Sequence, residues 1–168
     1  NSTVHSKATS PSFFSIADAV RVHARSRPNK PALESRGSNC TWATLDARVT
    51  KVAMELRQRG VVRGQTVAML VGNSVWSWTA ILGALRAGAT VVPISTMLRS
   101  AMVSKFLQDS AARFFVISQE WDQLALEAAA TTDVTAVDAS INALGTAATA
   151  SLERVIESAS RAIDEYTG

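Results

Sequence analysis

The stretch Leu82-Gly-Ala-Leu-Arg-Ala-Gly-Ala-Thr-Val-Val-Pro-Ile-Ser95 decides the fold of this 168-residue chain. Its first half carries the small and apolar residues of a buried helix end, and Gly88 follows at a position where helices commonly stop. Residues 90–94 then read as a buried strand, which Pro93 brings to its end. A helix that leads directly into a buried strand is half of a βαβ crossover. The stretch therefore predicts a parallel sheet.

The segments on both sides of this stretch repeat the same alternation. Residues 65–71 form a continuous apolar run, as in a strand buried on both faces, and residues 75–87 form a helix that is apolar nearly all round. Further helices are predicted at residues 15–24, 43–59, 100–108, 124–130 and 151–163, and further strands at residues 31–35, 40–42, 112–117 and 134–137. The fold class predicted is α/β, with a doubly wound, mostly parallel sheet and helices on both faces.

The spacing of apolar residues assigns a core face to each helix. In helix 43–59, with Asp46 in its first turn, the core positions are Leu45, Val49, Val52, Ala53 and Leu56. In helix 15–24, capped by Ser15, they are Ile16, Ala19, Val20 and His23, and in helix 100–108 they are Val103, Phe106 and Leu107. In helix 75–87, Trp76, Ala80, Gly83 and Ala87 form a face that would let a neighbouring backbone approach closely. Trp76 and Trp78 point to different helix faces, so we expect core anchors and no ligand platform.

Length and composition indicate one domain with a substantial core. We expect a flexible tail over residues 1–12, a single α/β domain over residues 13–168 and a mobile loop over residues 138–150. The single cysteine, Cys40, excludes an intramolecular disulfide and is expected as a small buried hydrophobe. There is no apolar run of transmembrane length and no secretory signal at the start. These features favour a cytoplasmic protein.

Charge excludes one class of partner. The net charge is +3, and the densest basic stretch comprises Arg21, Arg25, Arg27, Lys30 and Arg36. Aromatic residues are not interleaved with these side chains, so a nucleic-acid groove is not predicted. A solvated helix end and loop explain the stretch.

Ligand chemistry in such a fold is expected beyond the carboxyl ends of the strands, where the sequence predicts three strand-to-helix loops. The loop Val71-Gly-Asn-Ser74 has a single glycine, so it is neither a phosphate loop nor a dinucleotide fingerprint. The loop at residues 93–99 offers Arg99 to an anion, but a hydroxyl-capped connection with a solvated arginine explains it. The loop at residues 118–121 offers Glu120, which the helix dipole explains better. Paired acids and bases, a nucleophile elbow and metal-ligand spacings are all missing. We therefore assign no catalytic or metal-binding residue and leave cofactor-binding residues unknown.

Five motifs in order resemble those of the adenylate-forming ligase superfamily, the AMP-dependent enzymes that include acyl-CoA synthetases. The resemblance covers about residues 13–121, and each motif has a counterpart among the family's core motifs and turns. The motifs are Thr41-Trp-Ala-Thr-Leu-Asp-Ala-Arg48, Leu56-Arg-Gln-Arg-Gly-Val-Val-Arg-Gly-Gln-Thr-Val-Ala68, Val71-Gly-Asn-Ser74, Leu85-Arg-Ala-Gly-Ala-Thr-Val-Val-Pro-Ile94 and Asp109-Ser-Ala-Ala-Arg113. Gln65 stands where the family commonly has aspartate, and Val75 where it has proline.

The resemblance implies an N-terminal subdomain of a ligase of fatty-acid metabolism or a related aryl-acid ligase. The complete enzyme would use ATP and Mg²⁺ to convert a carboxylic acid to an acyl-adenylate, and CoA to form the thioester. The family's phosphate loop should follow residues 151–163, where Glu165-Tyr-Thr-Gly168 ends the sequence. We expect the 168 residues alone to be inactive, to bind none of these cofactors and to have the remainder of the ligase as their partner.

Two other interpretations stay open. In the first, the chain is a stand-alone binding or assembly module that keeps the fold but has no catalytic activity. Exposed apolar surface would then drive its self-association. In the other, it is the N-terminal part of an amino-acid adenylation domain. The motifs do not identify the acid that is activated.

Overall fold

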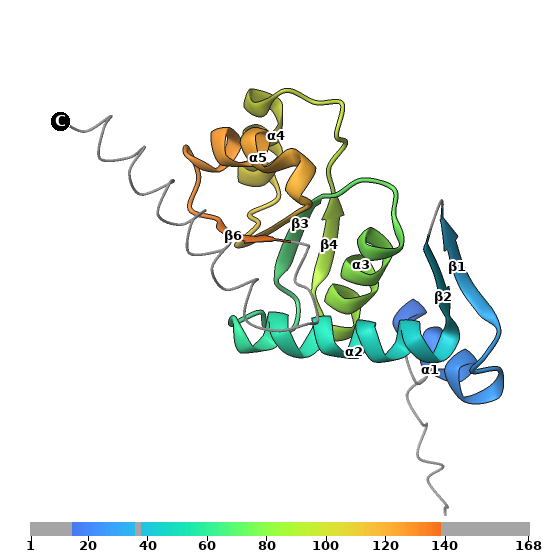
Figure 1. Cartoon of the computed structure of the whole chain (residues 1–168). Helices are drawn as coiled ribbons and strands as arrows, with labels where there is room; N and C mark the ends of the chain where they lie inside the picture. Colours follow the sequence, from blue (N-terminus) through green and yellow to red (C-terminus); the bar gives the residue numbers. More distant parts are fainter. Residues whose placement is uncertain (1–14, 36–37, 139–168) are drawn as a thin grey trace, which may run out of the picture.

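The computed structural model describes residues 15–35 and 38–138, and a four-stranded parallel sheet lies at its centre (Figure 1). The strand order is β4-β3-β5-β6, and all three pairings are parallel. The strands are β3 (Thr66–Leu70), β4 (Thr90–Pro93), β5 (Phe114–Ile117) and β6 (Thr135–Asp138). This confirms the parallel sheet expected from the sequence.

Helices cover both faces of this sheet (Figure 1). Helices α2 (Trp42–Gln58) and α3 (Val75–Ala87) lie on one side, and α4 (Ser100–Asp109) and α5 (Asp122–Ala129) lie on the other. The strands feed both cores, because Val67 and Met69 join the α2/α3 cluster while Ala68 and Leu70 join the α4/α5 cluster. The doubly wound architecture is therefore confirmed.

A smaller unit packs beside the α2/α3 layer. It consists of α1 (Ile16–Ser26) and an antiparallel hairpin of β1 (Pro31–Ser35) and β2 (Ser38–Thr41). Val20 of α1 and Cys40 of β2 share a buried cluster with Leu45 and Val49 of α2. Helix α1 and the hairpin thus extend the apolar core beyond the sheet.

The stretch Leu82–Ser95 has the predicted structure. Gly88 ends α3 in the left-handed conformation (φ 93°), which glycine adopts without strain. The Thr90 amide donates to the carbonyl of Gln65, just before β3, and the Ile94 amide donates to the Met69 carbonyl of β3, each at 2.8 Å. Because alternate residues of a strand bond to opposite sides, Pro93 occupies a position that faces away from β3. The missing N–H of Pro93 is tolerated because β4 is an edge strand among the described residues.

Three predicted core side chains are exposed, and these predictions were wrong. Trp78 is 48% exposed, Phe106 44% and Ile16 65%. The buried faces of α3 are taken by small residues that draw α2 and the sheet close, which leaves the large ring of Trp78 outside. In α4, Val103 and Leu107 alone reach the sheet core. In α1, the buried residues are Ala17 and Val20, so its core face is rotated from the predicted one.

Two boundaries also differ from expectation. Trp42 was predicted in extended structure, but it opens α2 because the Thr41 side chain caps this helix by accepting from the Thr44 amide. Asp46 consequently lies beyond the first turn, where its carboxylate meets Arg86. The predicted tail (1–12), the loop at 139–150 and the helix at 151–163 lie outside the described residues. Within residues 15–35 and 38–138, no helix is long and apolar enough to cross a membrane.

A reciprocal cap fixes the start of α1. The Ser15 hydroxyl accepts from the Asp18 amide at 3.3 Å, and the Asp18 carboxylate accepts from the Ser15 amide at 3.1 Å. These bonds to the backbone and hydroxyl of Ser15 lower the pKa of Asp18 from its ordinary value, with Arg21 adding to the effect. The depressed native pKa means that Asp18 contributes stability above its unfolded pKa, and this contribution is lost as pH falls through the native pKa.

We predict that Ser15→Ala lowers the free energy of unfolding by about 1 kcal/mol through loss of the cap. The pKa of Asp18 should also move up toward its ordinary value, because its two Ser15 contacts loosen. Urea unfolding and an NMR titration of the Asp18 carboxyl measure the two effects. Ser26→Ala, at the exposed far end of α1, is the control and should change neither quantity. An unchanged Asp18 titration in Ser15→Ala would contradict the prediction.

Candidate functional site

The carboxyl edge of the sheet is the candidate site, because ligands of open parallel sheets bind beyond the carboxyl ends of the strands. Three described loops leave this edge, at residues 71–74, 94–99 and 118–121. The first leads into α3, whose N-terminal amide at Ser77 is capped by the Ser74 hydroxyl at 3.1 Å. The first loop is therefore a capped helix start, as its sequence predicts.

The loops after β3 and β5 meet at this edge. A Cβ placed on Gly72 would stand 2.4 Å from Glu120 Oε1, so the absence of a side chain at residue 72 makes room for this carboxylate. The same oxygen accepts the indole N–H of Trp121 at 3.1 Å. Sequence analysis found Glu120 but assigned it only to the helix dipole, and it gave no sign that Gly72 would lie against it. The contact joins two loops and leaves the exposed carboxylate available to solvent.

The loop after β4 has a more open structure. The Ser95 hydroxyl accepts from the Met97 amide at 3.3 Å, and Met97 itself is almost fully exposed. Arg99 precedes α4 with an exposed side chain that makes no capping bond. Arg99 is therefore open to an anion, but the structure brings no second basic side chain of the described loops to it.

The cysteine and the histidine of the described residues are both held in structural roles. Cys40 is 2% exposed, and burial raises the pKa of its thiol, with Arg48 acting in the opposite direction. A buried, protonated thiol is a poor nucleophile, and this confirms its prediction as a small hydrophobe. His23 receives the Arg27 guanidinium at 2.8 Å from its Nδ1 and lies 4.6 Å from the Trp42 ring, centroid to centroid. Its imidazole is thus engaged at the base of the hairpin.

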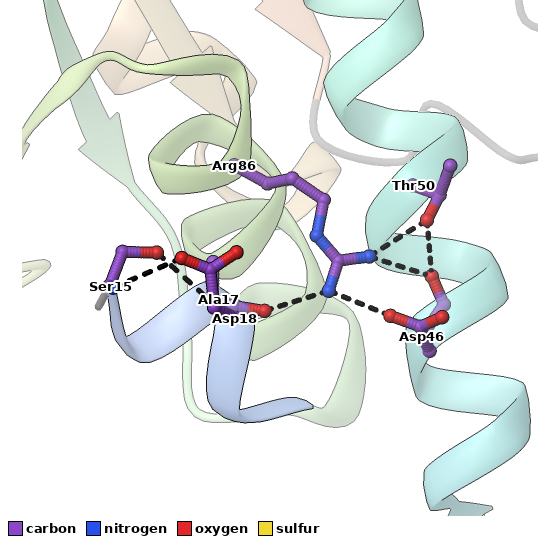
Figure 2. A network of polar contacts seen from close by, with 6 residues as sticks. All are labelled: Ser15, Ala17, Asp18, Asp46, Thr50 and Arg86. Carbon is purple, nitrogen blue, oxygen red and sulfur yellow. Dashed lines mark hydrogen bonds and ion pairs between the residues drawn. The ribbon is translucent and has the colours of Figure 1, made fainter. Parts of the chain in front are cut away.

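The most connected polar group of the described chain was missed by sequence analysis. Figure 2 shows Arg86 of α3 reaching α1 and α2 at once. Its guanidinium donates to the carbonyls of Ala17 (2.8 Å) and Asp46 (3.1 Å) and to the Thr50 hydroxyl (2.7 Å), and it pairs with the Asp46 carboxylate at 2.7 Å. All these partners belong to the protein, so this cluster joins three helices and is not a ligand site.

Two hollows of the described surface are large enough to consider, and the smaller one borders the carboxyl edge at the loop of residues 71–74. The larger, about 590 Å³, is lined at the amino ends of β5 and β6 by residues that include Arg113 and Asp133. The smaller, about 130 Å³, lies between the hairpin and the start of α3, beside Leu33 and Trp78. No group of three or more His, Cys, Asp or Glu side chains among residues 15–35 and 38–138 could hold a metal ion. The described residues thus form a folded scaffold, and the carboxyl edge of its sheet carries no metal site and no convergent set of polar side chains among them.

Comparisons with known proteins agree on one family. The sequence model described as "AMP-binding enzyme" matches residues 20–165. Surfactin synthase subunit 3 of Bacillus subtilis is 30% identical over 127 residues, which are 76% of this chain and 10% of that protein. The anthranilate CoA ligase AuaEII, solved in complex with anthranoyl-AMP, superposes with a TM-score of 0.68 at 26% identity, over 73% of this chain and 24% of that one.

A putative long-chain-fatty-acid CoA ligase from Rhodopseudomonas palustris has the same fold. It superposes with a TM-score of 0.73 at 23% identity, over 85% of this chain and 37% of that one. The chain thus spans 10% of the synthetase subunit and 24% and 37% of these two ligases.

Proposed function

The chain belongs to the family of AMP-binding enzymes, and on this premise we propose that it is the N-terminal part of a ligase that adenylates a carboxylic acid. The complete enzyme joins the acid to AMP with release of pyrophosphate and then passes the acyl group to the thiol of CoA. The family-model match across residues 20–165 is the observation that carries the proposal. Structural similarity to an anthranilate CoA ligase that holds an acyl-adenylate supports the acyl-CoA synthetase branch.

In our proposal, the described residues support the fold of the adenylating enzyme and do not themselves carry out its chemistry. Adenylation needs positive charge and amides arranged around the phosphates. The carboxyl edge provides an exposed Arg99 and a capped α3 start, and the described residues form no Mg²⁺ site. We therefore derive no step through ATP, Mg²⁺ or CoA on these residues. Their contacts are proposed to come from the remainder of the ligase, with residues 13–168 as one structural unit and the cytoplasm as its compartment.

A second candidate is the N-terminal part of an amino-acid adenylation domain. The 30% identity to Surfactin synthase subunit 3 over 127 residues favours it, as does the 37% identity over 87 residues to Syringomycin synthase SyrB1 of Pseudomonas syringae. The two candidates share the first half-reaction and differ in the thiol that receives the acyl group, which is CoA in one and a carrier protein in the other.

We predict that the 168-residue polypeptide gives no acid-dependent exchange of ATP with pyrophosphate. The reason is that the contacts to the ATP phosphates and to Mg²⁺ are proposed to come from the remainder of the ligase. The polypeptide encoded by the native gene should catalyse exchange with at least one acid from a panel of fatty, aryl and amino acids. Thioester formation with CoA then separates the two candidates. Exchange by the 168 residues alone would contradict the scaffold proposal, and no exchange by the native product would contradict the ligase proposal.

A further inference from the structure

The hairpin of β1 and β2 is a two-stranded sheet that stands apart from the central sheet (Figure 1). Among residues 15–35 and 38–138, its strands pair only with each other. Alternate residues of β1 bond to β2, so the N–H and C=O groups of the other residues point to the free edge of β1. Such an edge can accept a further strand, and a two-stranded sheet alone is only marginally stable. The free edge of β1 is therefore a position where the described fold can be extended.

The smaller hollow, of about 130 Å³, lies on the β1 side of the hairpin. Its lining there comes from the consecutive residues 33–35, whereas the described β2 residues, 39–41, take no part in it. The apolar part of its wall is Leu33, Val75 and Trp78, and Trp78 is 48% exposed. Leu33 packs against the buried cluster that contains Val75. An apolar side chain placed in the hollow would therefore extend this core and remove the Trp78 ring from water.

Polar residues surround this apolar wall. Glu34, Ser35 and Asn73 also line the hollow, and Glu34 and Ser35 are exposed. An exposed apolar patch with a polar rim is typical of a protein contact surface. The free edge of β1 adds a backbone contact, as in proteins that bind a peptide by strand addition. The expected occupant is thus an extended segment that pairs with β1 and places an apolar side chain in the hollow.

We propose that this occupant is a segment from the remainder of the ligase, an inference that rests on the proposed function. The chain spans 24% and 37% of two ligases that share its fold, so the larger part of each of those enzymes lies outside the matched region. The hollow also borders the loop of residues 71–74 at the carboxyl edge, where the remainder is proposed to bring its contacts to ATP. Pairing of β1 with β1 of a second copy would instead bring two Glu34 carboxylates onto one short ladder, where like charges are unfavourable.

Hydrogen exchange and thiol labelling test the two parts of the contact, in the polypeptide encoded by the native gene and in the 168-residue chain. Amides within residues 31–35 should exchange about tenfold more slowly in the native product, because the added strand accepts their hydrogen bonds. The thiol introduced by Trp78→Cys should likewise react with a maleimide about tenfold more slowly there. Cys40 is buried and should not react. Val22→Cys replaces a side chain of matched exposure on α1, so it is the control and should react alike in both proteins. Mass spectrometry assigns each label, and far-UV circular dichroism shows that the variants are folded.

Equal exchange and equal labelling in the two proteins would overturn the inference, as would slow labelling at residue 78 without slow exchange in β1. Protection of the 168-residue chain that rises with its concentration would assign the edge to a second copy and would overturn it as well. Acid-dependent exchange of ATP with pyrophosphate, measured on the same preparation, separates this failure from that of the ligase proposal. An active native product with an unprotected edge would refute the strand contact alone. An inactive product with a protected edge would refute the ligase assignment and support the strand contact.

Discussion

Gly83→Leu should leave the chain without its native fold, or destabilise it by at least about 4 kcal/mol, because the α2–α3 contact is built around a missing side chain. A Cβ on Gly83 would stand 2.4 Å from Val52 Cγ1, 2.6 Å from Val52 Cβ and 3.4 Å from the Val49 carbonyl oxygen. The buried, β-branched side chain of Val52 and the helix backbone at Val49 cannot move aside to make room, as a flexible surface side chain could. Urea unfolding followed by circular dichroism measures the loss.

A single methyl group gives a more quantitative version of the same test. Gly83→Ala should cost about 1–3 kcal/mol from overpacking, even though alanine favours helix over glycine by about 1 kcal/mol. Val52→Ala, which costs about 2 kcal/mol alone, removes the atoms in the way. In that background Gly83→Ala should cost at least about 1 kcal/mol less, as a coupling in a double-mutant cycle. Ala47→Leu, on the exposed side of α2, is the size control and should be nearly neutral. Additive effects of the two substitutions would refute the close approach.

Much of the contact between α2 and α3 could be predicted from the sequence. The five positions predicted to form the α2 core are all buried, and the small face of α3 does receive a neighbouring helix. Periodicity identifies a helix face because one side of a regular helix always returns to the same direction. Gly88, Pro93 and the apolar runs at β3 and β5 were predictable for the same reason, since each depends on local geometry.

Features that depend on two distant segments were not predictable in this way. Trp78 and Phe106 are apolar residues on helices that pack against the sheet, and their exposure follows from how far the neighbouring layer extends. Glu120 meets Gly72 because two parallel strands lie side by side, and periodicity does not specify strand order. The candidate site was predictable only as an edge of the sheet, since the described loops offer capping groups and isolated charges rather than a convergent set.

Arg86→Met should be the most damaging single substitution of a polar side chain in the described chain, at about 3–5 kcal/mol. The Arg86 side chain is 7% exposed, and it is the shared partner of the Asp46 carboxylate and of carbonyl groups on two other helices. Methionine fills a similar volume but leaves the carboxylate without its cation and the Ala17 carbonyl without its donor. The free energy of unfolding in urea measures the loss, and amide hydrogen exchange should show α1 opening first, because Arg86 is its polar link to α3.

The geometry of the guanidinium, and not its charge alone, carries this effect. Arg86→Lys keeps the charge but cannot bond to α1 and α2 in the same fork, so it should recover less than half of the loss. Arg57→Met is the matched control, because Arg57 also bonds to a carbonyl of α3, at 2.9 Å, yet is exposed. It should cost less than about 1 kcal/mol, as solvated polar contacts do. Asp46→Asn combined with Arg86→Met should cost less than the sum of the two, since the second change removes a charge that the first left unpaired. Equal losses for Arg57→Met and Arg86→Met would show that burial at the three-helix junction does not set the strength of this cluster.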